Sequence, residues 1–351
     1  MLRKIDWEGQ IGRRLSLRDL HVFFTVVQRG SMAKAAAQLG VSTPTVSEVI
    51  ADLENGVGVQ LLDRSPQGVE PTRYGHALLK RSLAAFDELK QGIRDIEFLS
   101  DPTTGELRIG CSESIAAILP PFIRGFSQEF PRVVVHVDNV VPAPFLQGSQ
   151  QALAPGLSEL RDRKVDLVLG RVLKPLPDDL LGNDLQVEML FDDPLVVATG
   201  LQTRWARRRK IALSELVDGP WTLPGPHTWN YLGLAESFRA HDLPLPKVSL
   251  VTFSVPLRID LLVNGEFVTA LPKSVADRYA VKVLPINLAV RPWSVVAITL
   301  KNRTLSPVVK RFIERAGEVA KSLVAESKIR SHEPRRRTTS SARGICTTSR
   351  D

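Results

Sequence analysis

The sequence of 351 residues predicts a mixed α/β protein with an N-terminal winged helix-turn-helix, a long linker helix and a larger α/β sheet domain. Residues 16–74 show short helical patterns followed by a turn-rich β segment. Residues 75–100 continue as one long helical pattern, and residues 104–325 alternate β-rich with helical runs, which is typical of an α/β sheet domain. Residues 1–15 are an N-terminal extension, and residues 326–351 form a basic tail that we expect to be disordered.

The composition is that of a globular protein, with 43% hydrophobic residues. The net charge of +8 is a weak argument for nucleic-acid binding, because the excess lies in residues 204–210 and in the tail, not in the first hundred residues. The charged start does not predict a secretory signal. The sequence contains no apolar run of about 18 residues, so we expect no membrane span. Only Cys111 and Cys346 occur, far apart, so we expect no disulfide framework and a cytoplasmic location.

Two short helices joined by a glycine turn open the first domain. Apolar residues at helical spacing predict a helix over residues 17–29, which Gly30 ends. Ser31 can cap an alanine-rich helix over residues 32–39, whose small side chains allow close approach of another helix. Gly40 then supplies the positive φ of a tight turn.

The next helix carries poor helix formers on its outer face. Ser42 is a good N-cap, and Pro44 falls in the first turn, where its missing N–H costs nothing. The residues expected to face the core are Val46, Ile50 and Leu53, and those expected to face outward are Thr43, Thr45, Ser47, Glu48 and Asp52.

A helix-turn-helix explains this outer face, because the start of its second helix lies in the major groove of DNA. Short hydroxyl side chains can approach base edges and phosphates closely there, and Glu48 could accept from cytosine N4. The alternative is an ordinary pair of helices with a polar exposed face. Glu48 and Asp52 favour that alternative, since carboxylates repel phosphate.

Short β-runs around the turn Pro66-Gln67-Gly68 predict a wing beside the second helix. The residues expected to touch phosphate are Arg64, Ser65, Thr72 and Arg73, unless they are ordinary solvated loop residues. The complete predicted DNA-contacting set is Ser31, Ser42, Thr43, Pro44, Thr45, Ser47, Glu48, Arg64, Ser65 and Thr72.

The long helix carries two apolar lines, which predict a short seam for a second helix. Leu79, Phe86 and Ile93 recur every seven residues, and Leu89 and Ile96 form a second line. The alternative is a helix packed on its own domain.

No catalytic pattern is visible in the α/β segment. Gly110-Cys111-Ser112-Glu113-Ser114 lacks the final glycine of a nucleophile elbow, and the histidines show no metal-ligand spacing. We therefore expect no enzyme, no cofactor and no metal. Ser112 and Ser114 stand between a strand and a helix N-terminus, where backbone N–H groups can bind an anion, unless both merely cap the helix.

The first domain resembles the LysR-type transcriptional regulators. The matching residues are Leu20, Phe23, Val26, Gly30, Ser31, Ala35, Ala36, Leu39, Val41, Ser42, Pro44, Val46, Ser47, Ile50, Leu53, Glu54, Gly58, Val59, Leu61, Arg64, Thr72 and Gly75. Thr43 and Glu48 depart from the pattern, which often has Gln and a basic residue there, so the base preference is not carried over.

The resemblance implies a periplasmic-binding-protein-like effector domain with two α/β lobes and the effector between them. The expected crossovers are residues 168–172 and 266–270, with lobe one over 104–172 and 267–325 and lobe two over 174–266. The candidate effector-binding residues are Ser112, Ser114, His227, Thr228, Thr252, Ser254 and Phe267. The other residues of 224–228 and 267–271 are further cleft candidates, and His227 and Trp229 could equally be core or surface residues.

The function implied by the resemblance is regulation of transcription. The expected partners are double-stranded promoter DNA, a small and anionic effector, and further copies of the chain in a dimer of dimers; a contact with RNA polymerase stays open. Two other classes remain at this point. One is a solute-binding protein with a degenerate DNA-binding head, and the other is an enzyme fused to a helix-turn-helix.

Overall fold

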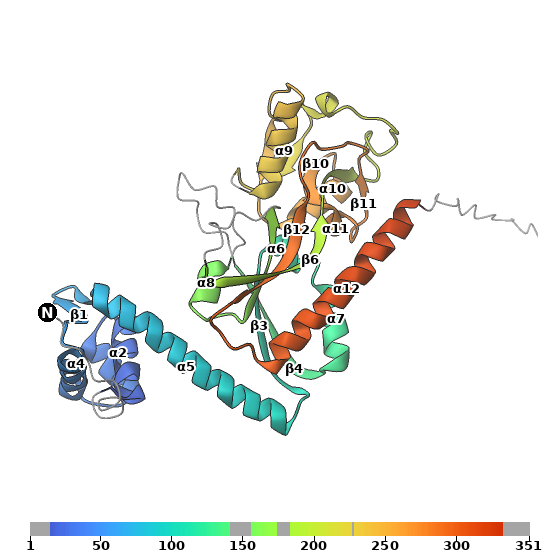
Figure 1. The fold of residues 1–351 in the computed structure, drawn as a ribbon. Helices are drawn as coiled ribbons and strands as arrows, with labels where there is room; N and C mark the ends of the chain where they lie inside the picture. Colours follow the sequence, from blue (N-terminus) through green and yellow to red (C-terminus); the bar gives the residue numbers. More distant parts are fainter. Residues whose placement is uncertain (1–14, 141–155, 174–182, 227, 333–351) are drawn as a thin grey trace, which may run out of the picture.

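The computed structural model describes residues 15–140, 156–173, 183–226 and 228–332. A small head, one long helix and a two-lobed body follow one another along the chain (Figure 1). The head elements are α2 (Leu17–Arg29), α3 (Met32–Leu39), α4 (Thr43–Val57), β1 (Leu62–Ser65) and β2 (Gly68–Pro71), and the long helix is α5 (Arg73–Ser100). Within the described ranges, no helix is long and apolar enough to cross a bilayer.

The head is the predicted winged helix-turn-helix. Each of its three helices begins at a serine N-cap and ends at a left-handed glycine, as at Gly40, whose φ is 68°. Strands β1 and β2 pair antiparallel as the wing. The first turn of α5 packs closely against Leu61, and only glycine fits at position 75. A Cβ at Gly75 would lie 2.1 Å from the carbonyl oxygen of Leu61.

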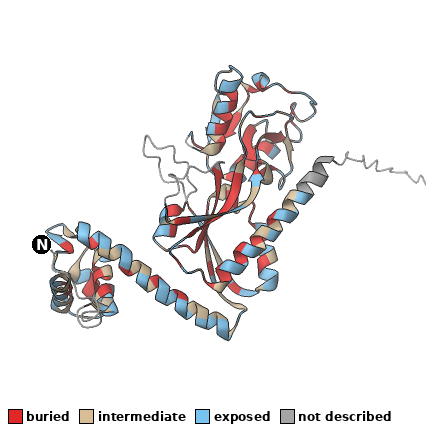
Figure 2. Cartoon of the chain, in the orientation of Figure 1, coloured by how far each residue is buried: buried red, intermediate tan, exposed pale blue. Residues whose placement is uncertain are grey.

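The two halves of α5 differ in what they contact. Leu79 and Phe86 pack against the head core, and the Phe86 ring meets the His21 ring edge-on at 6.0 Å. The later half exposes most of its surface (Figure 2). The two predicted apolar lines therefore do not form one continuous seam, because Leu79 and Phe86 of the first line pack on the chain's own head.

The body contains two five-stranded sheets. Lobe one has the strand order β4-β3-β5-β12-β6, from β3 (Thr104–Cys111), β4 (Arg132–Asn139), β5 (Leu167–Leu173), β6 (Leu185–Asp193) and β12 (Trp293–Leu300). Lobe two has the order β11-β7-β10-β8-β9, from β7 (Leu195–Gly200), β8 (Trp221–Leu223), β9 (Val248–Val251), β10 (Val268–Pro272) and β11 (Val281–Val283).

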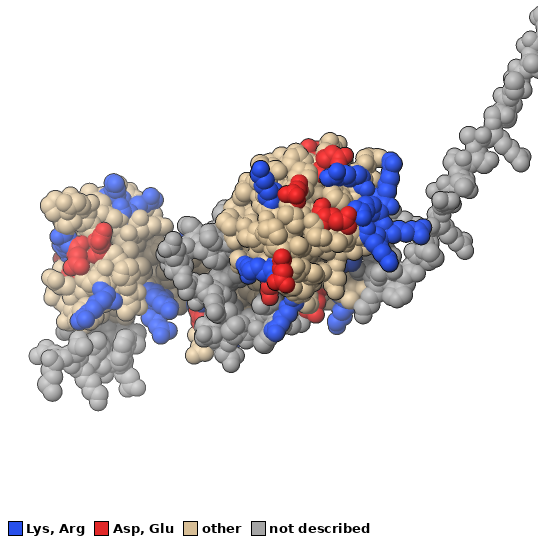
Figure 3. All heavy atoms as spheres, turned by 90° about the horizontal axis from the view of Figure 1, so that it is seen from above, with Lys and Arg blue, Asp and Glu red and all other residues tan. Residues whose placement is uncertain are grey.

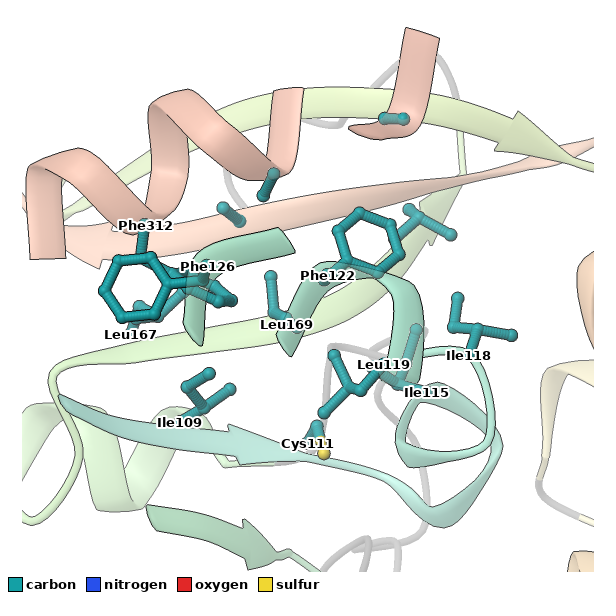
Figure 4. Packing of buried hydrophobic residues seen from close by; sticks show 14 of the residues in the cluster. Ile109, Cys111, Ile115, Ile118, Leu119, Phe122, Phe126, Leu167, Leu169 and Phe312 are labelled. Atoms are coloured by element: carbon teal, nitrogen blue, oxygen red, sulfur yellow. The ribbon is translucent and has the colours of Figure 1, made fainter. Parts of the chain in front are cut away.

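The helices cover these sheets and fill the boundary between them. They are α6 (Glu113–Ala116), α7 (Pro120–Glu129), α8 (Leu157–Arg161), α9 (Trp229–Ala240), α10 (Val255–Asn264), α11 (Lys273–Ala276) and α12 (Pro307–His332), with a 3₁₀ turn over Leu213–Leu216. Phe122, Phe126 and Phe312 form the centre of the core of lobe one (Figure 4). Val255 and Ile259 of α10 belong to the same cluster, so apolar packing continues from one lobe into the other.

Three predicted boundaries differ from the structure. Residues 168–172 lie in β5 of lobe one and residues 268–272 form β10 of lobe two, so neither predicted crossover joins the lobes. The chain passes between the sheets at Pro194, between β6 and β7, and again between β11 and β12. The last helix runs on to His332, past the predicted start of the tail at residue 326.

Candidate nucleic-acid interface and effector site

Helix α4 has the shape that a groove-reading helix needs. The Ser42 hydroxyl accepts from the Thr45 backbone N–H at 3.2 Å, and Pro44 occupies the first turn. Val46, Ile50 and Leu53 are buried, whereas Thr43, Pro44 and Glu48 are exposed and Ser47 is half-buried. The outer face of α4 therefore consists of hydroxyls and acidic groups, without a lysine or arginine anywhere in the helix.

Several of the predicted contact hydroxyls are already used inside the head. Ser42 Oγ lies 2.8 Å from Thr45 Oγ1, so these two hydroxyls bond to one another. The Ser31 hydroxyl accepts from the Lys34 backbone N–H at 3.5 Å as the cap of α3.

Thr72 connects the wing to helix α5. Its hydroxyl donates to the Gln60 carbonyl at 2.8 Å and accepts from the Gly75 N–H at 3.1 Å as the N-cap of α5. The only hydrogen of this hydroxyl is committed to Gln60, and a phosphate oxygen can only accept. The Thr72 hydroxyl therefore has a structural role at this joint, and its phosphate contact stays a prediction.

The wing keeps one cation available to solvent. The Arg64 side chain is 49% exposed and lies 3.8 Å from Glu54, a distance at which the pairing is weak. Ser65 donates to the Gly68 carbonyl at 3.4 Å at the tip of the wing. Glu54 was missed as a site-building residue: its Oε1 accepts from the N–H groups of Leu61 and Leu62, which fixes the wing against the end of α4.

The later half of α5 presents an apolar stripe. Leu89, Ile93, Ile96 and Leu99 are between 51% and 80% exposed. They recur three or four residues apart, so they lie along one side of the helix. The stripe contains both members of the second predicted line, Leu89 and Ile96, together with Ile93 of the first line and Leu99.

A buried set of charges fastens the middle of α5 to lobe one. We call Asp87, Arg94, Arg163, Asp166 and Arg303 the linker ion cluster. Arg303 donates to Asp87 through Nε at 2.7 Å and Nη2 at 3.0 Å, and to Asp166 at 2.9 Å. Arg163 adds a 2.5 Å bond to Asp87, and Arg94 adds a 3.1 Å bond to Asp166. Each aspartate thus receives two guanidinium groups, one of which, Arg303, is shared.

Ser112 and Ser114 stand at the end of β3, where lobe one meets lobe two. Their hydroxyl oxygens lie 3.2 Å apart, and Arg171 Nη1 donates to Ser114 Oγ at 3.0 Å. Ser112 occupies the N-cap position of α6 without making a side-chain cap bond. The capping alternative is therefore not what the Ser112 side chain does.

Arg171 is neutralised inside this junction. It donates to Asp193 Oδ2 through Nε at 3.0 Å and Nη2 at 2.8 Å, and its guanidinium stacks 5.5 Å from the Trp229 ring centroid. Ser274 of α11 donates to the same Asp193 oxygen at 2.6 Å. Sequence reasoning missed Arg171 and Asp193 because each stands within a strand pattern, with its partner in another strand.

The other predicted effector residues divide into three groups. Thr228 and Ser254 are the N-caps of α9 and α10, and the Thr252 hydroxyl accepts from the Ser254 N–H at 3.2 Å. Phe267 packs against the core cluster of lobe one, and its carbonyl accepts from Thr199. His227 lies outside the described residues.

One direct bond joins the Ser112–Ser114 turn to lobe two. Glu113 Oε1 accepts from the backbone N–H of Val255, the first residue of α10, at 3.2 Å. The predicted Ser114 and Ser254 therefore belong to one junction, built from the N-terminal turns of α6 and α10.

Most of the positive charge lies away from the head. Residues 204–210 form turns after β7, where Arg204 and Arg208 stack on Trp205 and Arg208 pairs with Glu215. Seen from above, Lys and Arg gather at one side of the body, while basic and acidic groups mix on the head (Figure 3). The head therefore has no strongly basic face in this view.

Two family models match the chain. The model described as "Bacterial regulatory helix-turn-helix protein, lysR family" matches residues 17–76, and the "LysR substrate binding domain" matches residues 100–321. The regulator TdcA of Escherichia coli (strain K12) is 25% identical over 305 residues, which cover 86% of this chain and 92% of that protein. The transcriptional dual regulator GltC of Bacillus subtilis (strain 168) is 29% identical over 309 residues, covering 86% and 96%.

Solved structures show the same fold. Full-length CbnR in complex with its target DNA superimposes with a TM-score of 0.57 at 19% identity, covering 87% of this chain and 100% of that chain. Full-length OxyR from Pseudomonas aeruginosa gives a TM-score of 0.56 at 21% identity, covering 88% and 95%. The family models span the head and both lobes, and the family consists of DNA-binding regulators and not of enzymes. This chain belongs to the LysR family of transcriptional regulators.

Proposed function

We propose that the chain reads its operator through the exposed start of α4 and adjusts that binding when a small anion enters the junction of the lobes. The observation that carries the first part is the outer face of α4, where Thr43, Ser47 and Glu48 stand on a helix whose opposite side is fully buried. Hydroxyl and carboxylate groups at the start of such a helix reach base edges in the major groove. A regulator acts where the chromosome lies, which supports the predicted cytoplasmic location.

Few groups of the head are expected to contact phosphate. Arg64 on the wing is a cation with only a long internal pairing, and Ser65 flanks it. Because α4 carries no lysine or arginine, we expect base contacts to supply a larger share of the binding energy than in a strongly basic recognition helix. The predicted consequence is a shallow dependence of operator affinity on salt.

The anion site is supported by the groups that gather where α6 meets α10. Two hydroxyls, Ser112 and Ser114, lie at the end of a parallel strand, which is the edge where α/β sheets bind ligands. Effector control requires that the anion bind two arrangements of the oligomer with different affinity. The exposed stripe of α5 is the surface we assign to pairing of two copies.

Footprinting on DNA flanking the chain's own gene tests the DNA-reading part. The wild type should protect a long two-part site, and the double variant Ser47→Ala with Arg64→Ala should lose it. A matched control, Ser158→Ala with Arg311→Ala, removes the same kinds of group from exposed positions on the body and should leave the footprint unchanged. Equal protection by wild type and the Ser47/Arg64 variant would refute the assignment of α4 and the wing.

A further inference from the structure

Arg258 is a buried cation with too few partners. It lies on α10, one turn from the start of the helix, and is 2% exposed. Among the described residues its guanidinium makes one hydrogen bond, a long one of 3.5 Å from Nη1 to the Ala270 carbonyl, and its Nε has no partner. Burial of an unpaired charge is costly, so such a group in a native protein needs an explanation.

The first turn of α10 also favours a negative charge near Arg258. The backbone N–H groups at the start of a helix carry a partial positive charge and attract anions. Ser254 caps this turn through a 3.4 Å bond from the Leu257 N–H, which leaves the Val255 N–H for another acceptor. That acceptor is Glu113 of lobe one, at 3.2 Å.

Glu113 is also the carboxylate that acts on Arg258. Burial lowers the pKa of the Arg258 guanidinium to about 10, and the charge of Glu113 opposes this effect. No carboxylate lies within ion-pair distance of Arg258 among the described residues, in contrast to Arg171, which has Asp193 at 2.8 Å. The charge of Arg258 is thus offset at longer range, from the other lobe.

We propose that the first turn of α10 and Arg258 form a carboxylate subsite of the lobe junction, in which Glu113 occupies only the Val255 N–H and from which a ligand carboxylate displaces it. The proposal rests on the effector site proposed above and names the chemistry of its ligand. A carboxylate suits the site because the group that occupies it is one, and a single negative charge balances the single guanidinium. The rest of the ligand would lie toward Ser112 and Ser114, the neighbours of Glu113.

Displacement makes Glu113 an internal competitor. Glu113 binds α10 from within the same chain, so a ligand must overcome an intramolecular bond before it gains its own. Exchange replaces a bond between the lobes by a bridge through the ligand. Such an exchange gives the ligand different affinities for the two arrangements of the lobes, which is the requirement for effector control.

Chemical rescue of a Glu113→Ala chain tests the proposal with formate as the probe. Removing the side chain frees the Val255 N–H, which Glu113 now occupies, and formate should bind there and restore the stability that the variant has lost. With formate at about ten times its dissociation constant, the thermal midpoint of the full-length variant should rise by about 3 °C, saturably. Sodium chloride at equal ionic strength measures the general salt effect, and sulfate separates carboxylate from other oxyanions.

Three further chains complete the design. Glu113→Gln fills the space without charge, so formate should not stabilise it. Glu113→Ala with Arg258→Met should also give no rescue, and it should fold because it removes a buried unpaired charge. Glu106→Ala removes an exposed carboxylate that pairs with Arg108, as a matched control, and should respond to formate no more than the wild type.

The outcomes are distinct. Saturable rescue of Glu113→Ala that requires Arg258 supports the subsite. A folded Glu113→Ala chain that gains nothing over chloride refutes it, as does equal stabilisation of all variants, and a response to sulfate but not formate refutes the carboxylate specificity. The footprint of the wild type is read separately, so protection of DNA without rescue means that only the subsite is wrong.

Discussion

Replacing Asp87 by Asn should loosen the attachment of α5 to lobe one. Asp87 is 8% exposed and receives both Arg303, at 2.7 and 3.0 Å, and Arg163, at 2.5 Å. Removing one member of a buried ion pair typically costs about 3–5 kcal/mol, because the partner charge stays buried without compensation. Arg303 keeps Asp166 and the Val165 carbonyl, so we expect the lower end, about 3 kcal/mol.

Hydrogen exchange of the α5 backbone is the direct assay, because it reports the free energy of local opening. Protection of the amides around Asp87 should fall by about two orders of magnitude in Asp87→Asn, which corresponds to about 3 kcal/mol. Glu88→Gln is the matched control: Glu88 is 43% exposed and lies 3.8 Å from Arg163, so its loss should change protection by less than about tenfold. Unchanged protection of α5 in folded Asp87→Asn would refute the reasoning that these charges hold the helix.

Three further predictions concern a thiol, the groove-facing acid and the apolar stripe. Burial raises the pKa of the Cys111 thiol to about 12, so little reactive thiolate should be present at pH 8. In a Cys346→Ser chain, Ellman's reagent should therefore find no reactive thiol until the protein is unfolded. Rapid reaction of the native chain would contradict the packing in Figure 4. Glu48→Gln removes a negative charge that faces the groove, so competition gel shifts should show binding to non-operator DNA strengthened by about three- to tenfold, and weaker binding would show that Glu48 does not face phosphate. Leu89→Glu with Ile96→Glu places charges on side chains that are 51% and 65% exposed, and sedimentation should show loss of the dimer while circular dichroism stays unchanged; an intact dimer would move the interface elsewhere.

The head was predictable because its signals are local. The capping serines, the left-handed glycines and the buried residues of α4 all lie within a few residues of the features they specify. Sequence reasoning could not foresee the structural role of Thr72, because that role depends on a residue outside the local pattern. A hydroxyl beside a wing resembles a phosphate contact until its bond to the Gln60 carbonyl, which lies in a different segment of the chain, is seen.

The body was predictable in class but not in its connections. A run such as residues 268–272 indicates a buried strand, and nothing in its hydrophobicity says which of two sheets it joins. The charged groups were harder still, because their partners are remote in sequence. Arg303 and Asp87 are 216 residues apart, so no spacing pattern could connect them.

The buried arginines of the body differ in whether they can still bind an added anion. Arg303 is held by two aspartates, and Arg171 by Asp193, each within 3.0 Å. Cations paired in this way gain little from an added anion, because their donors are occupied and their charge is already balanced. The Arg258 Nε has no partner among the described residues, and the carboxylate whose charge acts on Arg258 is Glu113 of the other lobe, which bonds to the Val255 N–H. An anion entering the junction would therefore gain most from Arg258, and in doing so it would replace the direct bond between α6 and α10.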